Sequence, residues 1–134
     1  DLSEIGATMG DQILLFLAER DGVPIAGALN FLGSYALYGR YWGCTEDVPF
    51  LHFELCYYRA IEEAIALGLP RVEAGAQGEH KLARGYVATP TYSAHYIPHP
   101  GFRAAVTDFL ARERRAVARD IDYLGELTPF RKGA

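Results

Sequence analysis

Two apolar runs of strand length flank an Asp-Gly pair near the start of the chain. The runs are residues 12–19 and 23–33, and the pair occupies positions 21–22. Because Asp-Gly accepts the positive φ angles of a two-residue hairpin turn, the runs are predicted to form adjacent antiparallel strands. A second turn at 33–34 leads into the aromatic run 35–42, a third strand. The three strands predict an antiparallel meander.

A long helix and a short strand are predicted after the meander. Residues 50–67 have helical spacing, with Thr45 or Asp47 as a cap at the start and the Gly-Leu-Pro stop at 68–70. Residues 71–75 then have strand composition. A strand, helix, strand sequence forms a crossover if the two strands are parallel. The sequence therefore predicts an α/β (α+β) fold with a mixed sheet.

The remaining segments complete the predicted single domain, residues 1–134. Residues 89–97 alternate and are predicted to form another strand, and residues 101–124 are predicted to form a long, charged C-terminal helix. Leu2, Ile5 and Met9 have helical spacing at the start of the chain, which begins without methionine. We therefore expect a piece of a longer protein.

Composition restricts the classes of function. The net charge is −4, so the total charge gives no sign of a strong polyanion binder. The two cysteines are too few for a disulfide framework and fit a reducing compartment, so we expect a cytoplasmic protein. No apolar run approaches the roughly 20 residues of a membrane span.

The segment GAQGEHKLARGY at 75–86 is the strongest candidate site. Ionisable side chains here follow two glycines at the predicted end of a strand, where α/β proteins tend to bind ligands. Lys81 and Arg84, three residues apart, could hold an anion on a helical turn, while Glu79 or His80 transfers a proton. The alternative is a solvated charged loop. The candidate residues are Gly75, Gly78, Glu79, His80, Lys81 and Arg84.

Glu54 is a second candidate catalytic residue. The positions four, seven and eleven residues later are Tyr58, Ile61 and Ile65, an apolar stripe. A carboxylate on that stripe is predicted to be partly desolvated, with either a functional role or a structural ion pair. Trp42 and Tyr58 are expected to pack in the core or to line a cleft. As cleft residues they are candidate substrate contacts.

Two further pairs have weaker support. His52 and Cys56 lie four residues apart, but two ligands do not make a metal site. Ser93 and His95 share a face of the predicted strand, yet the chain has no Gly-x-Ser-x-Gly elbow, so structural polar roles are favoured. We expect no metal.

The sequence resembles a family of bacterial Fem-like proteins of the GNAT (N-acetyltransferase) superfamily, described as proteins of peptidoglycan biosynthesis or recognition. The resemblance covers nearly the whole chain. It is carried by LYGRYWG at 37–43, LHFELCYYRAIEEAI at 51–65, GAQGEHKLARGY at 75–86 and TYSAHYI at 91–97. It implies the later part of a GNAT-fold acyltransferase domain whose earlier elements are missing.

Fem-type peptidyltransferases carry a Phe-Lys-x-x-Phe-Gly pattern after the equivalent strand. The matching run here is residues 80–85, in which Lys81 and Gly85 agree while His80 and Arg84 replace the aromatics. The resemblance therefore implies that Lys81 contacts an anionic donor or acceptor.

The resemblance leaves two acyl donors, acetyl-CoA and aminoacyl-tRNA. Acetyl-CoA-dependent members bind pyrophosphate with a glycine-rich loop before the long helix. The corresponding run here, GCTEDVPF, lacks that glycine spacing and places Glu46 and Asp47 near the phosphates. Like charge there disfavours pyrophosphate.

The sequence thus leads to two hypotheses. The first is an N-acyltransferase that moves an acyl or aminoacyl group to a small-molecule or peptide amine, with tRNA as a partner if the donor is aminoacyl-tRNA. The second is a non-catalytic module that binds a cell-wall peptide or another anionic ligand. A truncated domain would also expose apolar surface, so a homodimer is expected under either hypothesis.

Overall fold

The Asp-Gly pair forms the predicted hairpin turn. In the computed structural model, which describes residues 2–75 and 79–130, Asp21 and Gly22 have φ angles of 52° and 78°. Both are positive, as a turn between two tightly paired strands requires. The turn joins β1 (Ile13–Arg20) to β2 (Val23–Leu32), which pair in an antiparallel register.

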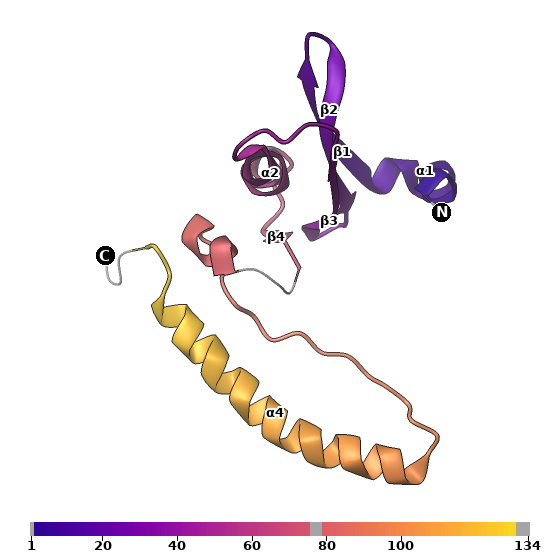
Figure 1. The fold of residues 1–134 in the computed structure, drawn as a ribbon, viewed down its shortest axis with the longest axis vertical. Helices are drawn as coiled ribbons and strands as arrows, with labels where there is room; N and C mark the ends of the chain where they lie inside the picture. Colours follow the sequence, from indigo (N-terminus) through magenta and orange to yellow (C-terminus); the bar gives the residue numbers. More distant parts are fainter. Residues whose placement is uncertain (1, 76–78, 131–134) are drawn as a thin grey trace. The chain divides into compact units, whose positions relative to one another are not determined.

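Two more strands complete a mixed sheet (Figure 1). β3 (Ala36–Cys44) is antiparallel to β2, and β4 (Arg71–Glu73) is parallel to β3. The strand order is β1-β2-β3-β4. The predicted mixed α/β fold, with a meander followed by a strand, helix, strand crossover, is therefore confirmed.

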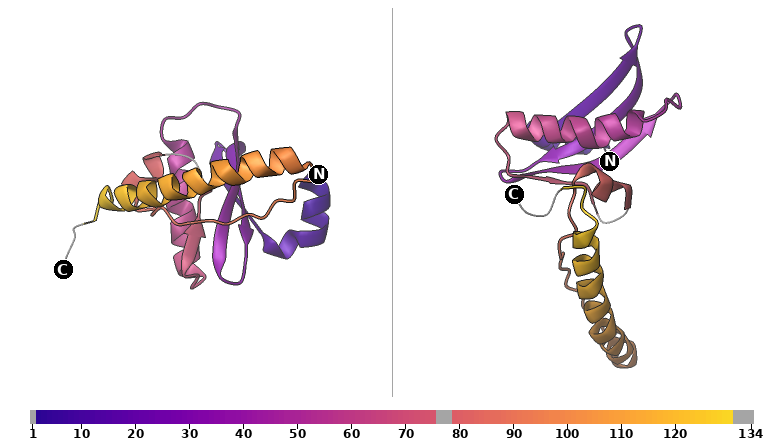
Figure 2. Two further views of the ribbon diagram at one scale, coloured as in Figure 1. Left: turned by 90° about the horizontal axis from the view of Figure 1, so that it is seen from below. Right: turned by 90° about the vertical axis from the view of Figure 1, so that its left-hand side faces the viewer.

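A continuous helical segment covers one face of the sheet (Figure 2). It comprises α2 (Leu51–Phe53), the π-helical segment η2 (Glu54–Tyr58) and α3 (Arg59–Ala66). Its buried side chains are Leu55, Tyr57, Ala60 and Ala64. Ala60 and Ala64 pack against the fully buried Leu37 of β3, and Leu55 packs against alanines of β2. The core of this unit lies between the helix and the sheet.

The start of this helix differs from the prediction. Neither Thr45 nor Asp47 caps it: the residue before α2 is Phe50, and no side chain caps the helix there. Thr45 instead extends the β2–β3 pairing, because its amide and hydroxyl both donate to the carbonyl of Ile25, at 2.8 and 3.2 Å. The helix ends near its predicted stop, with Leu67 as its C-cap.

Contacts within the chain divide it into two compact units, residues 1–77 and 78–134. The first also contains α1 (Leu2–Met9) and η1 (Gly10–Gln12). The second contains the 3-10 helix η3 (Glu79–Arg84) and α4 (Pro100–Glu126), which matches the predicted C-terminal helix. His99 caps α4, since its Nδ1 accepts a hydrogen bond from the amide of Phe102 at 3.1 Å. Among the described residues, no helix is long and apolar enough to cross a membrane.

The predicted strand at 89–97 is wrong. The chain between η3 and α4 runs without regular structure, drawn as a long trace in Figure 1. Its alternating composition fits an extended backbone, but Pro90 lacks an amide hydrogen and no strand pairs with this segment among the described residues. Tyr92 and Tyr96 are almost fully exposed. The alternating pattern of side chains at 89–97 therefore did not form a β-strand, because no other strand pairs with it in the described chain.

Candidate functional site

The predicted site residues fall into two groups, one in each unit. Trp42, Glu54, Tyr58 and Gly75 belong to the first unit, whereas Glu79, His80, Lys81 and Arg84 belong to the second. Gly78 lies outside the described residues.

In the first unit, Trp42 joins an aromatic cluster at the start of the helix. Its ring meets the His52 ring edge-on at a centroid distance of 5.3 Å. His52 also contacts the rings of Phe53 and Tyr57, each at 5.5 Å. Trp42 packs against the core formed by β2 and Leu55. His52 thus lies at the centre of a half-buried aromatic cluster, which the sequence alone did not reveal.

The backbone around this cluster is irregular. η2 is a π-helical insertion, a feature often found at functional sites. Phe50, just before the helix, has a φ of 67°, an outlier for a bulky residue, and its side chain is 78% exposed. Such strain tends to occur where a ligand is held. The start of the helix therefore carries two independent signs of a functional site.

Glu54 and Tyr58 begin and end η2, and both are exposed. The expected desolvation of Glu54 is therefore wrong, because the apolar stripe on which it was placed is not the buried face. Ile65, the last member of that stripe, is also exposed. Glu54 remains available to solvent and to a ligand, but without the predicted low-dielectric surroundings.

The parallel strands β3 and β4 pair over only three residues, ending at Tyr38 and Glu73. β3 continues to Cys44, and its pairing with β2 shifts register at Arg40, where a bulge lies between Gly39 and Tyr41. In the described chain, β4 does not extend along this later part of β3. Trp42 lies on this later part of β3.

The second group lies in and around η3. The predicted helical turn at 79–84 is present as a 3-10 helix of six residues, and Glu79 is its first residue. Gly85 closes the turn: its amide donates to the carbonyl of Leu82 at 3.0 Å and its φ is 87°. A Cβ at Gly85 would come within 2.8 Å of the Phe130 ring. The backbone angle therefore favours glycine at this position, and the exposed Phe130 ring would have to move to admit a Cβ.

Lys81 and Arg84 are half-buried and lie one 3-10 turn apart, so they share a face. Burial lowers the pKa of the Lys81 ammonium below its usual value. Arg84 Nη1 donates to the carbonyl of His80 at 2.7 Å, which fixes one end of its guanidinium, and the His80 side chain is exposed. The turn therefore holds two cations in a partly desolvated setting, as an anion site needs.

The loop before the helix has the acidic character noted in the sequence. Glu46 forms an ion pair with Arg20 at the end of β1, and both side chains are largely exposed. The helix that follows starts at Phe50 without a side-chain cap. Residues 43–50 before this helix lack the spaced glycines of a pyrophosphate loop, and their acidic side chains disfavour the pyrophosphate of acetyl-CoA.

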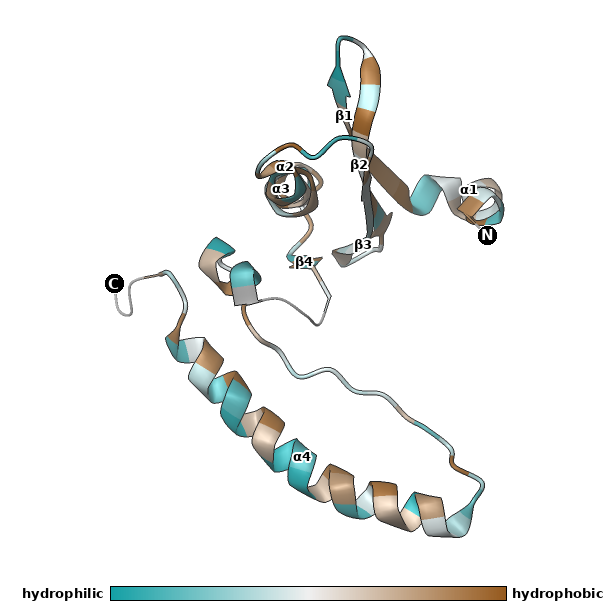
Figure 3. Ribbon diagram, viewed as in Figure 1, coloured by the Kyte–Doolittle hydropathy of each residue, from teal (hydrophilic) through white to brown (hydrophobic). Residues whose placement is uncertain are grey.

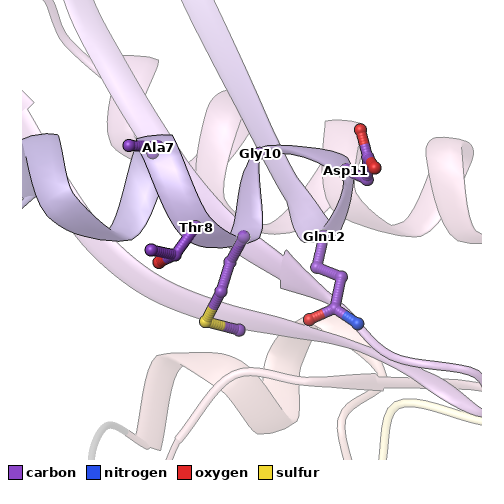
Figure 4. A pocket seen from close by; sticks show the side chains of 7 residues that line it. Ala7, Thr8, Gly10, Asp11 and Gln12 are labelled. Atoms are coloured by element: carbon purple, nitrogen blue, oxygen red, sulfur yellow. The ribbon is translucent and has the colours of Figure 1, made fainter.

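The remaining candidates do not form a second site. In the described part of the chain, no three His, Cys, Asp or Glu side chains gather as a metal site would require. His95 Nε2 lies 2.9 Å from Ser93 Oγ, but both are exposed on an irregular segment, which is not the strand whose face they were predicted to share. A shallow hollow lined by residues 6–12 is shown in Figure 4, where Thr8, Asp11 and Gln12 point in different directions.

Comparison with known proteins identifies the family. A family model described as FemAB-like, peptidoglycan biosynthesis/recognition, matches residues 2–132. The chain belongs to the FemAB-like family. No curated protein and no solved structure matches the chain significantly.

Family membership confirms the resemblance drawn from the sequence, and the mixed sheet with its covering helix is consistent with part of a GNAT-like domain. The features that sequence reasoning missed in this FemAB-like chain are the place of His52 in the aromatic cluster, the strained Phe50 and the contact of Phe130 with Gly85. The spacing of Phe50, Phe53 and Tyr57 along one helix was a visible signal for the aromatic cluster. Phe130 offered no such signal, because it lies 45 residues from Gly85 in the sequence.

Proposed function

We propose that this FemAB-like chain is part of an N-acyltransferase that moves an acyl or aminoacyl group to an amine of a peptidoglycan precursor. The observation that carries the proposal is Lys81. It occupies the lysine position of the Fem-type pattern, lies half-buried in a turn closed by the matching Gly85, and has a lowered pKa. An anion bound there would favour the charged ammonium and raise the pKa again.

The reaction needs three contributions from the protein. The donor and the amine must be positioned, the amine proton must be accepted, and the oxyanion of the attacked carbonyl must be stabilised. We propose Glu79 or His80 as the proton acceptor, with Glu54 as the alternative. Lys81 and Arg84 would hold an anionic part of the donor or acceptor. Within the first unit, Trp42 and Tyr58 would contact the substrate.

The donor is acetyl-CoA or an aminoacyl-tRNA. Glu46 and Asp47 before the helix disfavour the pyrophosphate of acetyl-CoA, so the aminoacyl donor is the first to test. A tRNA donor would bring the reaction to the cytoplasm, a location that stays a prediction.

Transfer of a labelled aminoacyl group from tRNA, or of an acetyl group from acetyl-CoA, to a muropeptide amine tests the proposal. Lys81→Ala is expected to lower kcat/KM by about 100-fold or more, as loss of a charge-stabilising group does. Arg115→Ala is the matched control, because Arg115 lies on α4 and its side chain bonds its own helix. Circular dichroism should show both variants folded.

Two results would contradict the proposal. Unchanged transfer by Lys81→Ala would remove Lys81 from the mechanism. Calorimetric binding of muropeptide by a protein that transfers nothing from either donor would instead favour the non-catalytic binding module.

A further inference from the structure

The face of the sheet opposite the helix carries exposed apolar side chains. Cross-strand pairs place Leu15 beside Leu29, Leu29 beside Tyr41, and Phe31 beside Tyr38 on this face. Leu15 and Leu17 are 54% and 50% exposed, and both reach over Gly27 of β2. We call this surface the open sheet face. Its members are Leu15, Leu17, Leu29, Phe31, Tyr38 and Tyr41.

α4 carries a second apolar surface. None of its 27 residues is buried, although hydrophobic and hydrophilic residues alternate along it with helical spacing (Figure 3). Phe102 and Phe109, one heptad apart, are largely exposed. We call this surface the α4 stripe. Its members are Phe102, Val106, Phe109, Leu110, Val117, Ile121 and Leu124.

Two carboxylates lie within the α4 stripe and limit what can cover it. Glu113 and Asp120 follow Val106 at successive seven-residue steps, so all three lie on the same line of the helix. If two α4 helices paired in parallel register, each acid would face its own copy. If they paired antiparallel about their shared centre, Glu113 would face Asp120. Like charges in an apolar seam are costly, so α4 is not suited to pair with itself.

The open sheet face offers the complementary charge. Arg40, at the bulge in β3, is exposed, and its guanidinium lies 5.4 Å from the centre of the Tyr41 ring. On the neighbouring edge strand β4, Arg71 contacts the Tyr35 ring and lies 3.4 Å from Glu73. The face is therefore apolar, with Arg40 and the Arg71–Glu73 ion pair at its margin, whereas the α4 stripe is apolar with acids along its centre.

We propose that α4 of one copy packs across the open sheet face of a second copy, with Arg40 facing Glu113 or Asp120. Exchange in both directions gives a dimer with twofold symmetry, in which the same two surfaces meet twice. Because the contact is made twice, the dimer buries twice the area of one contact. A stable interface buries about 1,600 Å² in total. The occupant of both apolar surfaces is thus the protein itself.

Sedimentation equilibrium over a range of protein concentrations tests the dimer. The protein is expected to dimerise, and Val117→Asp, which adds a third carboxylate to the stripe, is expected to make it monomeric. Ala111→Asp is the matched control, because Ala111 lies on the opposite side of α4 and the same charge there should leave the dimer intact. Circular dichroism and the fluorescence of Trp42 report whether each variant is folded.

A charge exchange supplies the second test. Arg40→Glu and Glu113→Arg are each expected to raise the dimer Kd by about tenfold, and the double variant should recover most of that loss. A protein that is monomeric at every concentration would overturn the proposal. A dimer whose Kd changes neither with Val117→Asp nor with the charge exchange would also overturn it. So would a monomeric protein whose free energy of unfolding changes with the charge exchange.

Discussion

The two long helical segments of this chain have similar sequence patterns and opposite surroundings. The segment from α2 to α3 buries four side chains against the sheet, whereas α4 buries none although its apolar stripe is longer. Periodicity therefore predicts that a segment is helical and which of its faces is apolar. It does not predict what that face will meet. The first unit therefore has its own core, whereas the helix of the second unit needs a partner to cover its apolar face.

Truncating the core of the first unit should have the largest effect on stability. Leu37 is fully buried between α3 and the sheet, so Leu37→Ala is expected to lower the free energy of unfolding by about 2–5 kcal/mol. Tyr123→Ala on α4 removes a larger but mostly exposed side chain, so the expected change is within about 0.5 kcal/mol. Urea unfolding followed by circular dichroism measures both.

The fluorescence of Trp42 adds a probe of the first unit alone, because it is the chain's single tryptophan. The urea midpoint of the Trp42 fluorescence transition should fall in Leu37→Ala and stay unchanged in Tyr123→Ala. Equal losses in the two variants would show that α4 is as well packed as the sheet, which would remove the contrast between the units.

Local signals predicted most of the first unit. The Asp-Gly turn, the Gly-Leu-Pro stop and the apolar runs each act over a few residues, and the structure has the hairpin, the helix end and the strands where they indicated. The predicted buried face of the helix was shifted by one residue toward the C-terminus. Ile61 and Ile65 were expected inside, yet Ala60 and Ala64 pack on Leu37, since small side chains let a helix approach a sheet closely. The π-helical insertion also has no simple sequence signal.

The candidate site depended on different information. The residue types at 79–84 left a solvated loop open as the alternative to a site, and only the Fem-type pattern singled out Lys81 together with Gly85. The structure gives a physical reason why residue 85 is a glycine. The sequence could not supply this reason, because Phe130 is distant from Gly85 in the chain. The strand predicted at 89–97 failed for the converse reason: local alternation was present, but pairing depends on another segment.

Replacing Gly85 should have the second largest effect on stability. It also distinguishes the turn η3 from the helix α4 within the second unit. Gly85→Ala places a side chain at a φ of 87° and against the Phe130 ring, so η3 should lose about 1–3 kcal/mol. Phe130→Ala in the same chain should recover the steric part of that loss only. Hydrogen exchange of residues 79–86, read by mass spectrometry, measures the change.

Gly125→Ala is the matched control for this glycine. Gly125 lies inside α4, and an added Cβ there would meet no atom within 4 Å, so alanine should stabilise the helix by about 0.5–1 kcal/mol. Opposite signs for the two substitutions are the expected result. If Gly85→Ala left exchange unchanged, the turn that presents Lys81 would not depend on this residue.

The two cysteines should give the smallest effect on stability and the clearest chemical contrast within the first unit. Burial raises the pKa of the Cys56 thiol to about 11, whereas Cys44 is exposed at the end of β3. At pH 8 only about a thousandth of Cys56 would be thiolate, the reactive form. Iodoacetamide should therefore modify Cys44 well before Cys56 in the folded protein, and mass spectrometry of peptides can compare the two rates.

The same burial sets the sign of the pH dependence. The folded state keeps the Cys56 proton up to about pH 11, while the unfolded thiol releases it near its ordinary pKa of 9.0. Stability from this group is thus fully present below pH 9 and is lost as the pH rises toward 11. Cys56→Ala should flatten that part of the stability curve, and Cys44→Ala should not. Rapid alkylation of Cys56 at pH 8 without unfolding would mean that the helix opens away from the sheet, which would make the first unit as loosely packed as the second.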